Sequence, residues 1–446
     1  MTTRTERAPT ILRGIGRWDL VALMVNITIG AGILGLPAKL FDLTHAYSVL
    51  ALVSCAVLIG FIEICFAEVG SRFVDSGGPY LIARTALGPS AGFIVGWLYW
   101  IVRVLTFATI ANLLVAYLAR FLPSAAAEPG RATIITLVVG GITLVHLIGI
   151  RHATIVGNAL TILKVGFLAA FGVLGALSAT GSLPVLGTPP PIGALGNAIL
   201  LGTFAFAGFE ASMVAAGETR DPRRDTPFAI ATSLLTALVL YLGVQVVCMM
   251  SVPGLATSAA PAADAAVAMW GPFGEQLVAG GAIIMMLGTL ASGFLATSRL
   301  PFAFAEQGDL PAVLTRVHAR FRTPHVAILG SAAIVLVATL ASSFLSAIKL
   351  AASTRILAYI AGCVALIVLR RRTDVPPAGF VAPYGSAFAV IAIALSVALL
   401  SSASRRELIQ LGLAALSGVF VYALFGSAAM RARRREALKL SPDDRD

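Results

Sequence analysis

Apolar runs of about 20 residues recur along the whole chain, and they constrain the fold more than any other feature. A run of this length crosses the roughly 30 Å hydrocarbon core of a bilayer as an α-helix. The chain is 58% hydrophobic and only 12% charged, with a mean hydropathy of +0.92, which leaves too little polar surface for a soluble protein of 446 residues. Because backbone groups in lipid must be hydrogen-bonded internally, the sequence predicts an all-α polytopic membrane protein.

We expect about twelve transmembrane helices. The third and eighth are long enough to tilt or to continue into solvent. The expected spans are 18–42, 46–70, 91–121, 131–149, 153–178, 193–217, 226–251, 272–306, 325–346, 348–370, 384–403 and 407–428.

The basic residues indicate the topology. If both termini are cytoplasmic, 22 of the 32 lysines and arginines lie on the cytoplasmic side and only five on the other, as the positive-inside rule requires. The net charge of +11 is therefore no sign of nucleic-acid binding. We expect short cytoplasmic tails at 1–17 and 429–446; the basic C-terminal tail fixes topology or contacts anionic lipid. Arginine outnumbers lysine 28 to 4, which suggests a GC-rich bacterial genome and an inner-membrane location.

Two expected spans contain breaks. The first carries IGAGILGLP (Ile29–Pro37), with three glycines and a proline inside an apolar stretch. Glycine costs a helix about 1 kcal/mol relative to alanine, and a broken helix at membrane depth is tolerated only beside protein or a water-filled cavity. Such glycines either allow close helix packing or leave backbone groups free to bind a ligand.

The second break favours ligand binding. In the sixth span, GTFAFAGFEA (Gly202–Ala211) places a glycine among aromatic residues and next to Glu210. Interrupted segments at corresponding places in two halves are typical of inverted-repeat transporters. We therefore expect one transporter domain over 18–428, with repeats at about 18–178 and 193–371 and two further helices at about 384–428.

The sequence resembles the amino acid–polyamine–organocation (APC) superfamily of permeases. Four stretches carry the resemblance in family order, and they span most of the chain: 29–37, 68–80, 204–230 and 295–324. The resemblance implies a five-plus-five inverted-repeat (LeuT-like) fold with helices 1 and 6 broken, and secondary transport of amino acids or related amines. It does not identify the substrate.

The resemblance also implies a set of binding groups. The substrate carboxylate would bind backbone amides of the first break, at Ala31, Gly32 and Ile33. The amino group would meet carbonyls near Ile29 and, in the sixth span, at Phe204, Ala205 and Ala207. Phe204 and Phe206 would face the substrate side chain or gate the site.

Lys164, in the fifth span, is the first candidate for proton coupling. Its surroundings resemble family members in which a lysine amine takes the place that sodium occupies in relatives of the wider fold. Burial disfavours the charged amine, so a lysine there can release and regain a proton. The alternative is a lysine that extends to the membrane interface.

Three further intramembrane charges are candidates. Glu210 is a second proton carrier by resemblance, or it pins the broken helix by accepting backbone N–H bonds. Arg103 lies mid-span in the third helix and needs a partner, such as Glu63 or an anionic substrate group; facing the cavity, it would disfavour cationic substrates. Arg355, in the tenth span, is a gate residue or a member of a buried pair.

We therefore expect a secondary active transporter, not an enzyme, that moves neutral amino acids with protons and without sodium. Exchange and sodium symport are the alternatives within transport, since Thr289 and Ser292 offer sodium ligands; a channel or a non-transporting sensor is the alternative outside it. The four cysteines and five histidines show no metal-ligand spacing, so neither metal nor cofactor is expected. The expected partners are the amino acid, protons and lipid; the oligomeric state is open.

Overall fold

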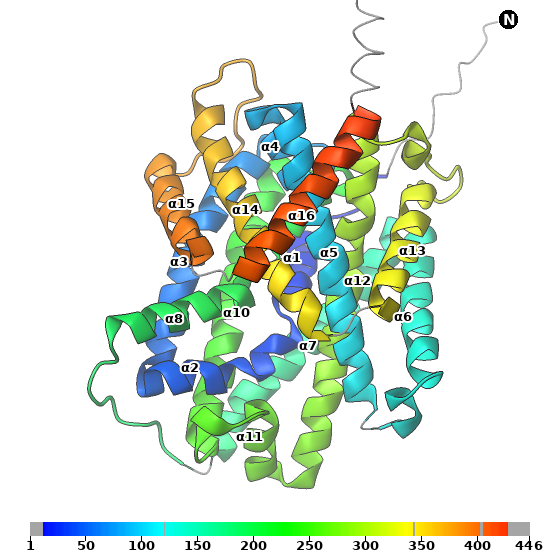
Figure 1. Cartoon of the computed structure of the whole chain (residues 1–446). Helices are drawn as coiled ribbons and strands as arrows, with labels where there is room; N and C mark the ends of the chain where they lie inside the picture. Colours follow the sequence, from blue (N-terminus) through cyan, green and yellow to red (C-terminus); the bar gives the residue numbers. More distant parts are fainter. Residues whose placement is uncertain (1–11, 120, 180, 342–343, 402–404, 427–446) are drawn as a thin grey trace, which may run out of the picture.

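The computed structural model describes residues 12–119, 121–179, 181–341, 344–401 and 405–426, and its regular elements are helices (Figure 1). Seven of the described helices are long and apolar enough to cross a membrane. The two interrupted segments are too short to count among them, and α13 and α15 give shorter apolar stretches. The expected all-helical, polytopic architecture is confirmed.

The first part of the chain forms α1 to α7, with short 3₁₀ turns between them. Their bounds are α1 (Arg17–Thr28), η1 (Ala31–Leu34), α2 (Leu36–Thr44), η2 (His45–Tyr47), α3 (Ser48–Gly70), α4 (Pro79–Leu87), α5 (Pro89–Leu118), η3 (Pro123–Ala126), α6 (Gly130–Leu147) and α7 (Ile150–Ser178).

The second part forms α8 to α16. Their bounds are α8 (Ile192–Thr203), η4 (Phe204–Phe206), α9 (Ala211–Val214), η5 (Ala216–Glu218), α10 (Pro222–Ser251), η6 (Leu255–Thr257), α11 (Pro261–Trp270), α12 (Pro272–Glu306), η7 (Ala312–Thr315), α13 (His325–Ala341), α14 (Phe344–Arg370), α15 (Gly385–Ser401) and α16 (Arg405–Val421), which continues as a π-turn (Tyr422–Gly426).

Two helices, α4 and α11, were not expected from the sequence. Each has ten residues or fewer and begins with a proline, so a search for span-length apolar runs passes over them. The basic C-terminal tail at 429–446 and residues 1–11 of the N-terminal tail lie outside the described residues.

The outer surface is apolar, as lipid contact requires. On α7, Ile162 is 72% exposed and Leu177 80%, whereas Lys164, a charged residue in the middle of the same helix, is fully buried. This reverses the usual arrangement of a soluble protein and matches a bundle whose polar groups face inward.

Two of the stretches that carry the family resemblance, 68–80 and 295–324, meet at α4. Tyr80 donates a hydrogen bond to Asp309 (2.6 Å), and Arg84 pairs with the same carboxylate (2.5 Å). Burial raises the pKa of the Tyr80 hydroxyl, and the bond to Asp309 raises it further. Tyr80 therefore stays a donor, which ties the segment after α3 to the segment after α12.

Ion pairs close the side of the bundle where α1 begins. Arg299 of α12 pairs through Nε with Glu218, and its Nη2 lies 3.3 Å from the second carboxylate oxygen; both side chains are at most 1% exposed. Arg17 pairs with Asp225 at 3.0 Å. The N–H of Ile15 donates to the Glu218 carbonyl at 2.9 Å, so the chain before α1 seals the same side.

Arg299→Ala should destabilise the protein strongly, because it leaves the Glu218 carboxylate buried and uncompensated. Removing one partner of a buried pair costs about 3–5 kcal/mol. Asp374→Ala is the matched control: its pair with Arg372 is solvent-exposed, and such pairs contribute little. Thermal unfolding in detergent micelles measures the stability of both variants. Equal shifts of the unfolding temperature would show that the buried pair stabilises the protein no more than the exposed pair does.

Candidate functional site

The first break lies between α1 and α2. Helix α1 ends at Thr28, and Ile29 and Gly30 are extended, with ψ of 93° and 172°. The 3₁₀ turn η1 follows, in which the N–H of Ile33 reaches the Gly30 carbonyl only at 3.4 Å. An extended pair between two helical pieces leaves backbone groups outside the helical ladder.

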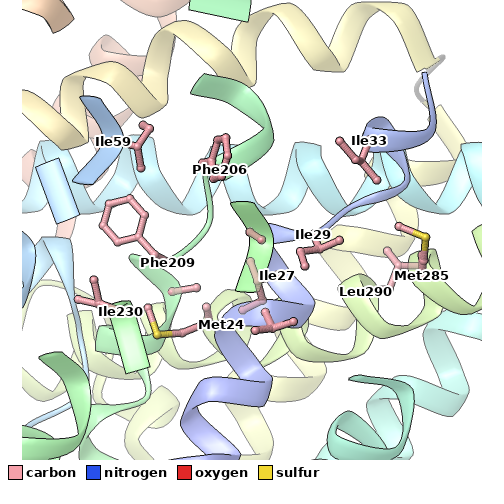
Figure 2. Packing of buried hydrophobic residues seen from close by; sticks show 14 of the residues in the cluster. Met24, Ile27, Ile29, Ile33, Ile59, Phe206, Phe209, Ile230, Met285 and Leu290 are labelled. Atoms are coloured by element: carbon pink, nitrogen blue, oxygen red, sulfur yellow. The ribbon is translucent and has the colours of Figure 1, made fainter. Parts of the chain in front are cut away.

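The second break lies between α8 and α9 and packs directly on the first. Gly208 has a φ of +130°, a conformation that side chains rarely adopt. A Cβ built on Gly208 would lie 2.8 Å from Ile27 Cγ2 and 3.1 Å from the Ile27 carbonyl oxygen. Only glycine permits both this backbone turn and this approach to the end of α1. Figure 2 shows Ile27, Phe206 and Phe209 around the contact.

A cavity of about 350 Å³ lies between the two breaks. Residues from six separate parts of the chain line this cavity. The lining residues are Ile27, Thr28, Gly30, Gly32, Ile33 and Leu36 at the first break, Arg103, Thr106, Thr109, Ile110 and Leu113 of α5, Leu201, Ala205 and Ala207 at the second break, Tyr241 of α10, Met286 and Thr289 of α12, and Arg355 of α14.

The glycines of the first break face this cavity. A Cβ on Gly30 or Gly32 would meet no heavy atom within 4 Å. Glycines kept for close helix packing show short contacts instead, as Gly208 does. Of the two explanations for these glycines, open access to the backbone therefore fits the geometry at Gly30 and Gly32.

Lys164 of α7 is fully buried against the end of α1. Its Nζ donates to the carbonyl oxygens of Asn26 (2.8 Å) and Ile29 (2.7 Å) and to Thr289 Oγ1 (3.0 Å) of α12. These three acceptors use all three donors of an ammonium group. The amine therefore links α1, α7 and α12 at the first break, and it does not extend to the membrane interface.

Glu210 holds the second break in place. Its Oε2 accepts from the Gly208 N–H (3.0 Å) and lies 3.5 Å from the Tyr359 hydroxyl, which donates to it. Its Oε1 lies 3.6 Å from Arg355 Nε. Arg355 thus belongs to a buried pair and also lines the cavity.

Arg103 lines the same cavity from α5 and is 4% exposed. Its Nη2 lies against Gly293 of α12, where a Cβ would come within 2.9 Å. Among the described residues it forms no ion pair with Glu63, the partner considered from the sequence. The cavity wall therefore carries two guanidinium groups, of which Arg355 has a carboxylate neighbour.

The remaining candidate residues lie at the breaks. Ile29 is buried, Ile33 and Ala207 line the cavity, and the Ala205 carbonyl accepts from the Tyr241 hydroxyl at 2.7 Å. Phe206 is buried with its ring 5.0 Å from that of Tyr241. Ala31 begins η1 and Phe204 begins η4, but their side chains lie outside the described part of the structure.

Sequence reasoning missed Tyr241 and Asn26. The Tyr241 hydroxyl also lies 3.3 Å from the Thr28 carbonyl, so it ties the two breaks together. Asn26 Nδ2 donates to Gly157 O (2.8 Å) and Thr161 Oγ1 (2.5 Å) of α7. Asn26 could have been found from the sequence, because it is a polar residue just before the break. Tyr241 could not, because an aromatic residue within a span gives no comparable signal.

Comparison with known proteins places this chain in a transporter family. The model of a family described as amino acid permeases matches residues 15–425. The branched-chain amino acid permease BcaP of Bacillus subtilis is 26% identical over 441 residues, 94% of each chain.

Two other relatives come from the same organism. The methylthioribose transporter is 25% identical over 410 residues, covering 85% of this chain and 86% of the relative. The putative arginine/ornithine antiporter is 26% identical over 350 residues, covering 70% and 74%. The named functions of these relatives are all transport functions, and the family match spans both breaks. The chain is a multi-pass membrane protein that belongs to the amino acid permease family.

Proposed function

We propose that the protein is a secondary active transporter of neutral amino acids, coupled to protons and independent of sodium. It works by alternating access on a five-plus-five inverted repeat, in the bacterial cell membrane with both termini in the cytoplasm. The observation that carries the proposal is the cavity between the two breaks, at which the backbone of Gly30 and Gly32 is open.

The cavity suits a small zwitterion. Its volume of about 350 Å³ is at the lower end of the roughly 300–1,000 Å³ usual for ligand pockets. The start of η1 offers backbone N–H groups to a carboxylate, and the carbonyls at Ala205 and Ala207 offer acceptors to an amino group.

The charge and polarity of the wall favour a neutral side chain. Arg103 and Arg355 disfavour a cationic one, and Ile33, Ile110, Leu113 and Met286 give the wall an apolar part. The relative BcaP, named for branched-chain amino acids, supports the same choice.

Lys164 supports proton rather than sodium coupling. Its ammonium group already binds the two carbonyls and the Thr289 hydroxyl that a sodium ion would need at this place. A metal ion and a protonated amine cannot share these oxygens, because like charges in a low-dielectric site repel strongly. Loss of the lysine proton would instead free the first break to move.

Alternating access needs one closed and one open side. The Arg299–Glu218 and Arg17–Asp225 pairs lie on the side where α1 begins, while the cavity extends toward Leu36 of α2 and Leu201 of α8. The conformation described here is thus closed at the proposed cytoplasmic side.

Amino acid exchange is the second candidate, because one relative is named as an antiporter. An exchanger would use the same cavity but would not accumulate substrate from a proton gradient alone. A channel or a sensor without transport would show neither accumulation nor exchange.

Competition for the cavity tests the substrate class. Purified protein in detergent should bind radiolabelled leucine, and unlabelled isoleucine, valine or methionine should displace it. Arginine and lysine should not compete, because their side chains would meet Arg103 and Arg355. Displacement by arginine at concentrations similar to leucine would contradict the neutral assignment, and displacement by glutamate alone would favour an acidic substrate.

A further inference from the structure

A second buried carboxyl group, that of Glu63, lies near Glu210 and outside the lining of the cavity. Glu63, in the middle of α3, is 2% exposed, and the structure gives it no hydrogen-bond donor among the described residues: its Oε2 is buried without a partner. Nothing in the proposed binding site requires an acidic residue at this place.

Helix geometry directs Glu63 toward the second break. Residues 59, 63 and 66 share one face of α3, at i, i+4 and i+7. Figure 2 shows Ile59 of α3 facing the segment that carries Phe206 and Phe209, and the Phe66 ring lies 5.4 Å from Phe209 and 6.0 Å from Tyr359. Glu63, between them, lies within electrostatic range of Glu210 and Tyr359.

The surroundings of the two carboxylates differ sharply. Glu210 has a backbone N–H, the Tyr359 hydroxyl and the Arg355 guanidinium around it. On its other side, Glu63 borders an apolar groove of about 530 Å³ between α3 and α10, whose wall includes Ile230 and Leu234. Glu210 thus has two donors and a cation beside it, whereas Glu63 has neither, and a buried carboxyl group without donors is stable only as the neutral acid.

The groups that face this pair from neighbouring helices are few. Tyr359 and Arg355 come from α14, and Tyr99 and Arg103 come from α5 on the Glu210 side. The sequences of α8 and α15 contain no titratable residue, and the part of α10 along the groove is apolar. Arg355 is the cation paired with Glu210. Among the described residues no cation pairs with Glu63, so the charge of Glu63 is uncompensated at this place unless the carboxyl holds a proton.

We propose that Glu63 holds the one proton that crosses the membrane in each transport cycle; the proton that Lys164 loses and regains controls the first break and is not the proton transported. In the conformation described here Glu63 is a carboxylic acid. When the second break moves, the O–H bond of Glu63 breaks and its proton adds to the Glu210 carboxylate. Arg355, no longer neutralised by Glu210, then compensates the negative charge left on Glu63. Glu210 then releases the proton to the cavity, and a proton from the opposite side reloads the pair in the next cycle. The proposal rests on the proposed proton coupling and adds the residue that carries the proton.

Glu63→Gln tests this in proteoliposomes, because glutamine keeps the shape of the acid but cannot release a proton. With an inward proton gradient of about one pH unit, one coupled proton limits leucine accumulation to about tenfold. We expect the wild type to approach this limit, and Glu63→Gln to fall to equilibration at about onefold while still exchanging leucine. Glu128→Gln, an exposed glutamate before α6, is the matched control and should accumulate as the wild type does.

The outcomes separate the two proposals. If the wild type accumulates leucine and Glu63→Gln accumulates it equally, Glu63 is not the proton carrier, although the transporter stands. If the wild type does not respond to the proton gradient, the proposed coupling itself fails, and the assignment of Glu63 falls with it.

Infrared spectroscopy supplies a test that does not depend on the folding of Glu63→Gln. The reconstituted wild type at neutral pH should show the C=O stretching band of a buried carboxylic acid. In Glu63→Asp, which keeps the acid but shortens its side chain, this band should shift, whereas in Glu128→Gln it should stay. Absence of the band from the wild type, or an unshifted band in Glu63→Asp, would overturn the proposal.

Discussion

Lys164→Ala should abolish proton-driven leucine accumulation. The substitution removes the ammonium donor that Asn26 O, Ile29 O and Thr289 Oγ1 share. Asn26 O keeps the Thr289 hydroxyl at 2.9 Å, but Ile29 O loses its 2.7 Å donor, and a buried acceptor left unpaired costs about 1–3 kcal/mol. It also removes the proposed link between proton release and movement of the first break. We expect accumulation to fall from about tenfold to about onefold in a gradient of one pH unit, measured in proteoliposomes with radiolabelled leucine.

Lys39→Ala is the control for this experiment. Lys39 lies on α2, close in sequence to the first break, but its side chain is exposed. Its replacement should leave accumulation at the wild-type level. If Lys164→Ala retained the full gradient-driven accumulation, the lysine would have only a structural role and the coupling argument would be wrong.

Gly208→Ala should disrupt the second break. The new Cβ would require a left-handed backbone conformation at φ +130° and would collide with Ile27 at 2.8 Å. Residues forced into such a conformation cost about 1–3 kcal/mol, and here the collision displaces the end of α1 that lines the cavity. We expect a lower unfolding temperature in detergent and a large loss of leucine binding.

Gly196→Ala in α8 provides the comparison. A Cβ at this position would meet nothing within 4 Å, and alanine is favoured over glycine in a helix by about 1 kcal/mol. This variant should be at least as stable as the wild type and should bind leucine normally. A Gly208→Ala protein with unchanged stability and binding would show that the second break does not shape the cavity.

The sequence predicted the main architecture because its causes are local. Span-length apolar runs follow from the thickness of the bilayer, and the places where α1 and α8 end follow from glycines that interrupt a helical pattern. The short helices α4 and α11 could not be predicted in this way, since neither spans a membrane and each ends at a glycine turn.

Less of the candidate site could be predicted from the sequence, because its contacts join segments that are distant along the chain. The position of Lys164 in the fifth span was visible, but its partner Thr289 lies 125 residues away. Glu218 as the partner of Arg299, Tyr241 as the tie between the breaks, and the cavity-facing position of Arg103 all depend on how helices pack. Which of these residues bind substrate or protons stays a prediction for the assays above.

The most direct test of proton-coupled neutral amino acid transport is leucine uptake into sodium-free proteoliposomes under an inward proton gradient. We expect leucine to accumulate to about tenfold per pH unit, the accumulation to collapse when a protonophore is added, and added sodium to change nothing. Uptake that requires sodium, or leucine that exchanges but never accumulates, would contradict the proposed proton coupling.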